Sequence, residues 1–294
     1  MKVIITGASS FTGKSLMPRL EEAGHEIFNI VRQDQGFSNK FLWNFTDDLP
    51  EDMPECQAII HLAAYIDFQN NLNISHYNVN TISTAKIAAF ACKRGAYLIF
   101  ASTVGVHGSK PTSFDNTTPI KPENNYAMSK YLAEEIVRTF VQKYTILRIG
   151  GIYGLDGPVH LGLNTAITNA YYKKEIPTSK GPGKAKRNYI CVYDVAQWII
   201  YLLGRYEANG YKEAMQPRET LYLAGSEVMT IEGYLREVAD ILLSGEDINR
   251  IAGQESKDMV IKFTPFPFKP ATFRQYLQSL SHSNRMATQG KPKD

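Results

Sequence analysis

The sequence lacks the features that mark membrane, secreted and nucleic-acid-binding proteins. No apolar run approaches the ~18 residues that a membrane-spanning helix needs, and the first residues lack the charged, apolar and small-residue regions of a signal peptide. The formal net charge of +3 is small for 294 residues, and there is no long Lys/Arg tract. These absences argue against a membrane or a nucleic acid as the partner, and we expect a cytoplasmic protein that binds a small molecule.

Cysteine is also scarce. Cys56, Cys92 and Cys191 are odd in number, far apart in the chain and set among apolar residues. This distribution is typical of buried thiols rather than of a disulfide framework or a zinc site. We therefore expect no bound metal.

Short apolar runs alternate with segments of helical periodicity. The strand candidates are Val3 to Thr6, Glu26 to Val31, Ala58 to Leu62, Tyr97 to Ser102 and Thr145 to Gly150, and a further short apolar run extends from Leu221 to Ala224. The helix candidates are Gly13 to Glu22, Thr81 to Lys93, Asn124 to Phe140, Ile231 to Leu243 and one that begins at Val195. Such alternation is typical of parallel strands joined by helical crossovers, so the sequence predicts an α/β fold with a doubly wound parallel sheet.

A glycine-containing loop follows the first predicted strand and leads into a helix. It reads Thr6-Gly7-Ala8-Ser9-Ser10-Phe11-Thr12-Gly13. The backbone N–H groups of such a turn can bind a pyrophosphate, and glycine leaves room for its close approach. The loop indicates a dinucleotide site, although an ordinary strand-to-helix turn uses the same residue types.

The end of the second predicted strand bears on the kind of dinucleotide. An acidic side chain there accepts hydrogen bonds from the ribose of NAD, whereas an arginine suits the extra phosphate of NADP. Arg32 stands at this place. We therefore favour NADP as the cofactor, with NAD as the alternative.

Tyr126 and Lys130 lie four residues apart at the start of a predicted helix, and hence on one face of it. A tyrosine hydroxyl ionises near pH 10, and an adjacent cation lowers the pKa of a neighbouring acid by roughly 1 to 3 units. The pair is therefore suited to a proton transfer in which Tyr126 acts as acid or base. The same spacing also arises by chance in a chain with 17 tyrosines, so its position relative to other motifs decides the interpretation.

Taken in order, these motifs resemble the extended short-chain dehydrogenases/reductases, of the sugar-nucleotide type in the NAD-dependent epimerase/dehydratase family. The family loop is Thr-Gly-x-x-Gly-x-x-Gly, and Ser10 replaces its middle glycine here. The run from Tyr97 to Thr103, followed by Val106-His107-Gly108, resembles the family strand that ends in the catalytic Ser or Thr before Val-Tyr-Gly. The resemblance covers about the first half of the chain and implies a Rossmann fold.

The resemblance also implies a role for each candidate residue. Tyr126 would exchange a proton with a hydroxyl or carbonyl oxygen, Thr103 would orient that oxygen, and Lys130 would lower the pKa of the phenol and hold the nicotinamide ribose. The implied cofactor-binding residues are Gly7, Ser10, Phe11, Gly13, Arg32, Leu62, Ala63, Ala64, Asn80, Tyr126 and Lys130. The implied substrate-binding residues are Ser102, Thr103, His107 and Arg187.

Arg187 is assigned from a second stretch, Gly181 to Ala196, which resembles the Gly-x-Gly, Arg and Asp-x-Ala segment of sugar-nucleotide epimerases and dehydratases. In that group the matching Arg grips the diphosphate of the substrate, a task that suits a planar bidentate donor. A solvated basic loop is the alternative, and Lys184 and Lys186 fit it better.

The reaction itself stays open. A 4,6-dehydratase of this group carries an acidic pair directly after the catalytic Thr, where this chain has Val104 and Gly105. A 4-ketoreductase, which Arg32 favours, and a 4-epimerase remain. A reductase of a non-nucleotide ketone and a non-catalytic dinucleotide sensor or scaffold are further alternatives. The resemblance also implies a homodimer formed through the helices at 81–93 and 124–140.

The chain is expected to divide into two parts. Residues 1–155 are predicted to form the dinucleotide-binding core, and residues 156–294 are predicted to form mainly a small C-terminal substrate-binding lobe. Segments 188–203 and 221–224 are expected to return to the core. The hydrophobic content of 44% is enough for one large core and a smaller second lobe.

Overall fold

The computed structural model of the chain describes residues 1–68, 72–210 and 217–289, with side chains described as far as His282. These residues form two compact units. The first contains the described residues of Met1–Pro111, Asn116–Ile149 and Val195–Leu223. The second contains Thr112–Asp115, Gly150–Asp194 and the described residues from Ala224 onward. The segments that we expected to return to the core, 188–203 and 221–224, overlap the range Val195–Leu223.

A seven-stranded sheet forms the centre of the first unit, in the order β12-β7-β5-β4-β1-β2-β3. Its strands are β1 (Lys2–Thr6), β2 (Glu26–Val31), β3 (Lys40–Leu42), β4 (Ala58–His61), β5 (Tyr97–Thr103), β7 (Tyr144–Ile149) and β12 (Arg218–Leu223). Neighbouring strands pair in parallel throughout. Because the chain winds outward from β1 to β3 and then returns to β4 on the other side of β1, the sheet is doubly wound. This confirms the predicted Rossmann fold.

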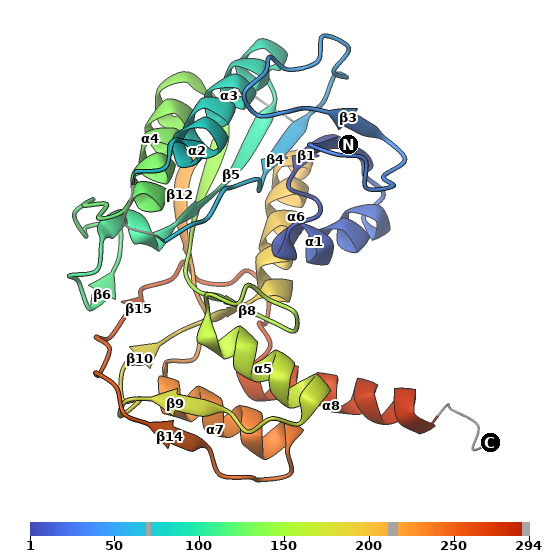
Figure 1. The fold of residues 1–294 in the computed structure, drawn as a ribbon. Coiled ribbons are helices and arrows are strands. Elements are labelled where there is room, and N and C mark those ends of the chain that lie inside the picture. Colours follow the sequence, from blue (N-terminus) through green and yellow to red (C-terminus); the bar gives the residue numbers. More distant parts are fainter. Residues whose placement is uncertain (69–71, 211–216, 290–294) are drawn as a thin grey trace. The chain divides into compact units, whose positions relative to one another are not determined.

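Helices cover both faces of this sheet (Figure 1). α3 (Ser83–Arg94) and α4 (Asn125–Phe140) pack on one face, where Ile87 and Val137 join Ile59 and Phe100 in a buried cluster. α1 (Phe11–Glu22) and α6 (Val192–Ala208) lie against the other face. Strands that are covered on both sides need apolar residues at consecutive positions, which explains why the predicted strands were continuous apolar runs.

The helix predicted from Thr81 to Lys93 is more complex than expected. The structure has α2 (Ile74–His76), a π-helical turn η1 (Tyr77–Ile82) and then α3 without a break. A short 3-10 helix, η2 (Val104–His107), follows β5. Strand β3 was not predicted, because three edge residues are too few to show an alternation. The bounds of β2 match the prediction.

The second unit consists of helices and short strand pairs. Its elements are β6 (Ser113–Phe114), β8 (Ile152–Tyr153), α5 (Gly162–Lys173), β9 (Thr178–Lys180), β10 (Lys186–Arg187), β11 (Ile190–Cys191), β13 (Met229–Thr230), α7 (Ile231–Leu242), β14 (Asn249–Ile251), β15 (Val260–Ile261) and α8 (Phe273–Gln289). The strands pair as β10 with β13, β11 with β8, β14 with β9 and β15 with β6. The rings of Tyr153, Tyr234 and Phe273 meet edge to face in its core, which contains residues of α5, α7 and α8.

Three observations bear on the composition arguments. No helix among the described residues has both the length and the apolar character to cross a membrane. The described part of the chain also contains no cluster of potential metal ligands. Cys56 and Cys191 are buried as expected, but Cys92 is exposed, because it lies on the outer side of α3.

Candidate functional site

The loop after β1 forms a close-packed turn in which both outer glycines are required. Gly7 has a φ of +78°, and a Cβ atom on it would lie 2.7 Å from the nitrogen of Ala63. A Cβ atom on Gly13 would lie 2.2 Å from the carbonyl oxygen of Gly7. Any larger residue would push β1, β4 and α1 apart at their meeting point. The turn therefore brings Gly7, Gly13 and Ala63 together, as the predicted cofactor site requires.

Ser10 fits the position where the family loop has its middle glycine. Its φ of −68° and ψ of 167° are ordinary extended values, so no glycine is needed. Its side-chain oxygen accepts a hydrogen bond from the N–H of Gly13 at 3.1 Å and caps α1. The next two N–H groups, of Phe11 and Thr12, have no acceptor within the helix. A helix terminus with such free N–H groups is a place where an anion can bind.

A buried histidine ties this loop to the end of β4. Thr6 Oγ1 accepts from the Ala63 N–H at 3.2 Å and donates to His61 Nδ1 at 2.6 Å. Thr84 Oγ1 donates to a carbonyl oxygen and so accepts from His61 Nε2 at 3.0 Å. Burial and the charge on Lys130 lower the pKa of His61 to about 3. His61 is thus a neutral core residue that fixes the ends of β1 and β4.

Asn80 lies in the π-helical turn and is completely buried. Its Oδ1 accepts from the N–H of Tyr65 at 2.8 Å, and its Nδ2 donates to the carbonyl oxygen of Tyr65 at 2.9 Å and to Ser129 Oγ at 2.9 Å. The amide group is therefore used within the protein. It anchors the segment after Ala64 to α4 beside Lys130, although we had assigned Asn80 to the cofactor.

α4 begins at a cap that sets the position of the predicted catalytic pair. Asn124 accepts from the N–H of Ala127 at 2.8 Å, and Tyr126 and Lys130 follow on one face of the helix. The ring of Phe68 meets the Tyr126 ring edge to face at 5.8 Å. The Lys130 ammonium lies 4.0 Å from the centre of the Phe100 ring, at 1% exposure. Neither the Tyr126 hydroxyl nor the Lys130 ammonium makes a hydrogen bond within the described part of the chain.

Burial shifts both groups toward their neutral forms. It lowers the pKa of Lys130 to about 7, and the negative charge of Glu134 acts in the opposite direction. Burial also raises the pKa of Tyr126 to about 12. We had expected Lys130 to lower the pKa of the phenol. In the structure the loss of solvation governs instead, so Tyr126 is a protonated hydroxyl at neutral pH.

Thr103 ends β5 and begins η2. Its Oγ1 accepts from the Gly105 N–H at 3.0 Å, which leaves the hydroxyl hydrogen available to another acceptor. A Cβ atom on Gly105 would lie 3.3 Å from Thr103 Oγ1 and 4.0 Å from the Cβ atom of Ala127. The turn after β5 therefore packs against the first turn of α4, next to Tyr126.

Ser102 and His107 lie in a buried polar network. Ser102 Oγ donates to Glu134 at 2.5 Å, and the same carboxylate accepts from Arg148 Nη2 at 2.7 Å. Arg148 Nη1 donates to the Tyr222 hydroxyl at 2.6 Å. The ring of His107 lies 2.9 Å from that hydroxyl and 3.1 Å from a carbonyl oxygen on its other side. Both residues, which we had assigned to the substrate, thus bond to neighbours in the first unit.

Arg32 directly follows β2 and is exposed. It forms no ion pair among the described residues. Asp34, two residues further on, pairs with Lys40 at 2.6 Å instead. The end of β2 therefore presents an unpaired guanidinium group.

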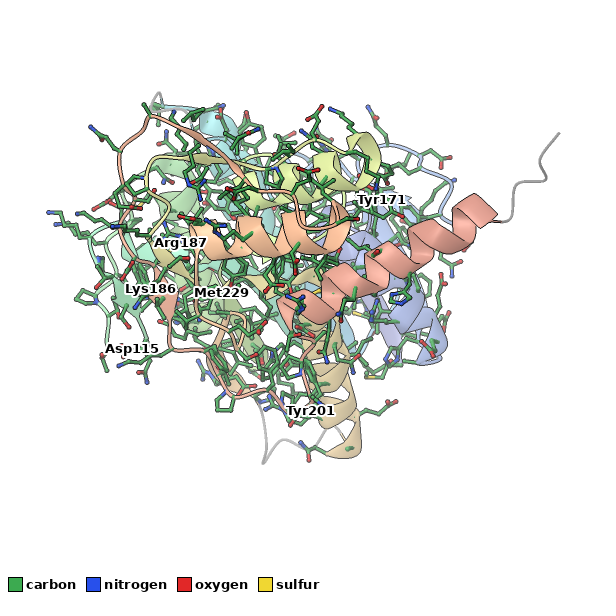
Figure 2. The ribbon with its side chains drawn as sticks, turned by 90° about the horizontal axis from the view of Figure 1, so that it is seen from below. Asp115, Tyr171, Lys186, Arg187, Tyr201 and Met229 are labelled. Carbon is green, nitrogen blue, oxygen red and sulfur yellow. The ribbon has the colours of Figure 1, made fainter. Side chains whose placement is uncertain are left out.

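Arg187 belongs to the second unit, in β10 (Figure 2). Its strand pairs with β13, where Arg187 is opposite Met229. Its guanidinium group donates to the carbonyl oxygens of Lys186 and Lys257, at 2.8 and 2.6 Å. The neighbouring lysines extend from an exposed part of the same loop.

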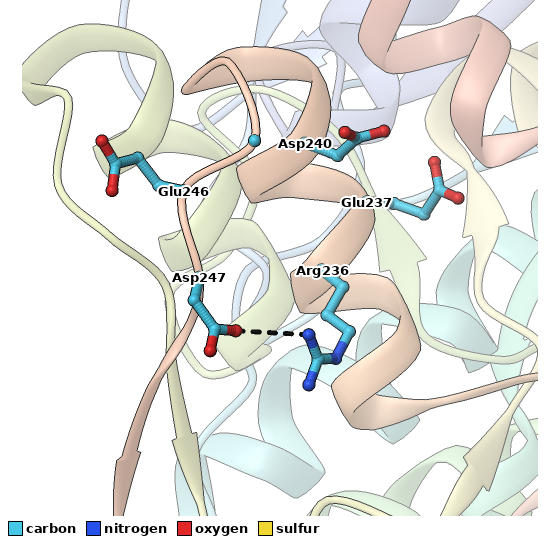
Figure 3. A pocket seen from close by; sticks show the side chains of 6 residues that line it. Arg236, Glu237, Asp240, Glu246 and Asp247 are labelled. Atoms are coloured by element: carbon cyan, nitrogen blue, oxygen red, sulfur yellow. Dashed lines mark hydrogen bonds and ion pairs between the residues drawn. The ribbon is translucent and has the colours of Figure 1, made fainter.

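None of these residues lines the hollow of about 410 Å³ that α7 and the turn after it form (Figure 3). It is lined by charged side chains, among which Arg236 pairs with Asp247 at 3.2 Å. Glu237 and Asp240 pair with Arg274. Because four of its five charged side chains are held in ion pairs, we assign the hollow no part in the site.

The model of one protein family, described as the NAD dependent epimerase/dehydratase family, matches residues 3–216 of this chain. The chain belongs to the NAD dependent epimerase/dehydratase family. The match covers more than half of the chain and confirms the resemblance given above.

Individual proteins are also similar to this chain in sequence or in fold. A GDP-6-deoxy-D-talose 4-dehydrogenase of Aggregatibacter actinomycetemcomitans is 31% identical over 219 residues, which are 71% of this chain and 72% of that protein. An uncharacterized UDP-glucose epimerase of Bacillus subtilis is 24% identical over 287 residues, or 87% and 88% of the two chains. The UDP-glucuronic acid 4-epimerase from Bacillus cereus, solved in complex with NAD, has the same fold, with a TM-score of 0.79 at 16% identity over 98% of this chain and 99% of that one.

Glu134, Arg148 and Tyr222 were not predicted from the sequence. Arg148 and Tyr222 are 74 residues apart in the chain, and only the sheet register makes them neighbours. Glu134 did leave a signal, because Tyr126, Lys130 and Glu134 repeat at intervals of four on one helix face.

Proposed function

We propose that this family member is an oxidoreductase that reduces the 4-keto group of a nucleotide-linked sugar with a nicotinamide dinucleotide. The observation that carries the proposal is the arrangement of Thr103, Tyr126 and Lys130 at the carboxyl ends of parallel strands, beside the close-packed glycine turn. In open α/β sheets this edge is where ligands bind.

The glycine turn fits a dinucleotide. Gly7 and Gly13 leave no side chain between the backbone and a pyrophosphate, and the N–H groups of Phe11 and Thr12 are available to its oxygens. Leu62, Ala63 and Ala64 would line its path toward Lys130. The bound dinucleotide would supply the hydride.

The protein would supply the proton and hold the substrate oxygen. Tyr126 is protonated at neutral pH because burial raises its pKa, so it is suited to donate a proton as the carbonyl becomes a hydroxyl. The Thr103 hydroxyl, whose oxygen is already held by Gly105, would donate to the same oxygen. Lys130 would place a positive charge near the oxygen as negative charge develops there.

The identity of a relative also favours a change at C4. The 31% identical relative is a 4-dehydrogenase of a 6-deoxy sugar nucleotide, and Val104 and Gly105 offer no acid or base for a dehydratase. A 4-epimerase is the second candidate, because other relatives are UDP-glucose epimerases. A reductase of a non-nucleotide ketone and a non-catalytic dinucleotide-binding protein are the remaining alternatives.

Two probes separate these reactions. With GDP-6-deoxy-D-talose and an oxidised dinucleotide, a 4-dehydrogenase or ketoreductase forms one reduced dinucleotide per sugar oxidised. With UDP-glucose, an epimerase changes the sugar without net reduction of the dinucleotide. We expect the first result, measured by nicotinamide absorbance and by chromatography of the sugar nucleotide. Turnover of UDP-glucose alone would select the epimerase. Dinucleotide binding without turnover of either sugar nucleotide would overturn the proposed activity in favour of the remaining alternatives.

The cofactor we propose is NADP, with NAD as the alternative. The unpaired Arg32 after β2 suits the 2′-phosphate of NADP, whereas the structural relative named above carries NAD. Titration with NADPH and NADH, followed by nicotinamide fluorescence, should show tighter binding of NADPH. Arg32→Ala should weaken NADPH binding by about tenfold or more and leave NADH binding unchanged. Preference of the unaltered protein for NADH would overturn this choice.

Arg187 is our proposed ligand for the diphosphate of the substrate. Arg187→Ala should raise KM for a sugar nucleotide with less effect on kcat, because the contact is remote from the reacting atoms. Lys184→Ala serves as the matched control in the same basic loop and should leave KM unchanged. Equal effects of the two variants would favour a solvated loop and a substrate without a diphosphate.

We also propose a homodimer formed through α3 and α4. Leu132 and Phe140 on α4 and Ile82 beside α3 are exposed apolar side chains on these elements. Leu132→Glu together with Phe140→Glu should convert a dimer into a monomer in sedimentation experiments. A monomer before substitution would overturn the proposal.

A further inference from the structure

A carboxylate lies one helical turn beyond Lys130 on the same face of α4. Glu134 is completely buried, with 0% exposure, although it has no assigned role in proton transfer. A buried carboxylate is costly unless other groups pair with it. Its partners therefore indicate what it does.

The partners of Glu134 come from two strands and its own helix. Its oxygens accept from Ser102 of β5 at 2.5 Å, from Arg148 of β7 at 2.7 Å and from Arg138 of α4 at 2.9 Å. Ser102 directly precedes Thr103 in β5. Glu134 thus joins the end of the strand that carries Thr103 to the helix that carries Tyr126 and Lys130.

We propose that Glu134 is a positioning residue for proton transfer, which holds the end of β5 against α4 and keeps Lys130 in its charged form. The inference rests on the proposed function, in which Thr103, Tyr126 and Lys130 act on the substrate oxygen. Glu134 acts through Ser102 on one side and through Lys130 on the other.

The negative charge that stabilises the Lys130 ammonium comes from Glu134, because the other groups packed around the ammonium are neutral. The ring of Phe100 covers the ammonium from β5. His61 of β4, whose ring nitrogens bond to two threonines, is neutral because burial and the charge on Lys130 lower its pKa. Tyr126 is a neutral phenol at physiological pH. Burial lowers the pKa of Lys130 to about 7, and the charge of Glu134 opposes that shift. Loss of the carboxylate would therefore favour the neutral amine.

Arg148 adds to this effect. Its guanidinium group is paired with Glu134 and contacts the Tyr222 hydroxyl. Without the carboxylate, its positive charge would be unpaired in the same buried region and would disfavour a second cation there. Both consequences of losing Glu134 reduce the protonated fraction of Lys130 near neutral pH.

Three variants separate the parts of the proposal. Glu134→Gln removes the charge and keeps the side-chain length, whereas Glu134→Asp keeps the charge and shortens the reach to Ser102. Glu219→Gln is the matched control. Glu219 is another carboxylate on this sheet that accepts from an arginine, Arg205, and from a hydroxyl group, at the opposite end of the strands.

The first measurement does not depend on turnover. Unfolding by denaturant below pH 7, where Lys130 is charged, gives a double-mutant cycle between Glu134→Gln and Lys130→Met. We expect the two substitutions to be coupled by about fivefold or more in the folding equilibrium constant. Lys130→Met combined with Glu219→Gln should be additive. Additive behaviour of Glu134 and Lys130 would overturn the proposal whatever the reaction is.

The second measurement uses GDP-6-deoxy-D-talose or UDP-glucose, whichever the unaltered protein converts. Glu134→Gln should lower kcat by about 10- to 100-fold with little change in KM. As pH rises, the activity of this variant should also fall at a lower pH than that of the unaltered protein, because a lower pKa makes Lys130 lose its proton earlier. Glu134→Asp should lower kcat and keep the pH profile of the unaltered protein, and Glu219→Gln should change neither.

The outcomes distinguish this proposal from the proposed function. Unchanged kcat and pH profile in Glu134→Gln, with Tyr126→Phe inactive, would overturn the role of Glu134 and leave the function intact. Full turnover of the probe by Tyr126→Phe would overturn the proposed proton transfer and with it the positioning role of Glu134 in that transfer.

Discussion

Two hydrogen-bonded networks lie at opposite ends of the same three strands of the sheet. At the carboxyl ends, Ser102 of β5, Arg148 of β7 and Tyr222 of β12 are direct neighbours in the register. Glu134 of α4 bonds to the first two of these residues. This network lies on the face of the sheet that α4 covers.

At the amino ends, the hydroxyl oxygen of Tyr97 in β5 lies 2.6 Å from Oγ1 of Thr145 in β7. Thr145 Oγ1 in turn donates to Oε1 of Glu219 in β12 at 3.0 Å. Arg205 of α6 pairs with Glu219. Thr145 and Arg148 are three residues apart in β7, so their side chains point to opposite faces. This second network therefore lies on the face that α6 covers.

The two networks have similar chemistry and different consequences. Both contain a carboxylate, an arginine and hydroxyl groups. Glu134 is completely buried beside Thr103 and Lys130, whereas the Glu219 side chain is 30% exposed at a hollow of about 280 Å³ near the end of α6. An ion pair by itself thus says little about function, and its place at the carboxyl edge is what connects it with the proposed chemistry.

The largest expected difference between the two ends concerns their tyrosines. Tyr126→Phe removes the proposed proton donor and should lower turnover by about 10² to 10⁴-fold with a small effect on folding. Tyr97→Phe leaves the Thr145 hydroxyl without one partner and should cost about 1 kcal/mol of stability while turnover is kept. Initial rates with the sugar nucleotide probes and denaturant unfolding measure both effects. Equal loss of turnover in the two variants would remove the distinction between the ends.

A smaller effect is expected when Lys130 is replaced, because burial of its ammonium group lowers the free energy of unfolding. The pKa of Lys130 is about 7 in the folded protein and 10.5 for an ordinary lysine. Between these values the unfolded chain binds more protons, so stability rises with pH through this window and the burial cost is complete below pH 7. Lys130→Met should therefore stabilise the fold by a few kcal/mol below pH 7, and the gain should vanish above about pH 10.5. Unfolding at several pH values tests this, and a gain that does not vary with pH would contradict it.

The smallest effect in this comparison concerns two glycines. Gly13→Ala places a Cβ atom against the Gly7 carbonyl and should cost about 1 to 3 kcal/mol and weaken dinucleotide binding. Gly204→Ala, in α6 next to Arg205, meets no atom within 4 Å and should stabilise the fold by about 1 kcal/mol. Thermal unfolding and nicotinamide fluorescence measure the two effects. A stable Gly13→Ala variant that binds normally would show that the turn is not close-packed.

Much of the fold could be predicted because its signals are local. Strands covered on both faces need continuous apolar runs, so the five predicted strands all fall within the seven-stranded sheet with ends that differ by at most a few residues. The glycine turn was visible for the same reason, since only residues without a side chain fit it. The π-helical turn at Tyr77–Ile82 was not visible, because its periodicity over six residues resembles that of an ordinary helix.

The candidate site was only partly predictable. The spacing of Tyr126 and Lys130 placed them on one helix face, but it did not indicate that burial would raise the pKa of the phenol. The bonds of Ser102 to Glu134 and of His107 to the Tyr222 hydroxyl were also not foreseen. These contacts depend on which strands become neighbours, and no short segment contains that information.

The sequence by itself determined the parallel sheet, the glycine turn and the family to which the chain belongs, because each depends on residues that lie close together along the chain. Only the tertiary structure decided the surroundings of the charged groups. Glu134 lies 32 residues after Ser102 and 14 residues before Arg148 in the chain. The sheet register makes Ser102 and Arg148 neighbours, and the packing of α4 on the sheet brings Glu134 to both. Solvation and charge depend on such distant neighbours, and they set the protonation of Tyr126 and Lys130.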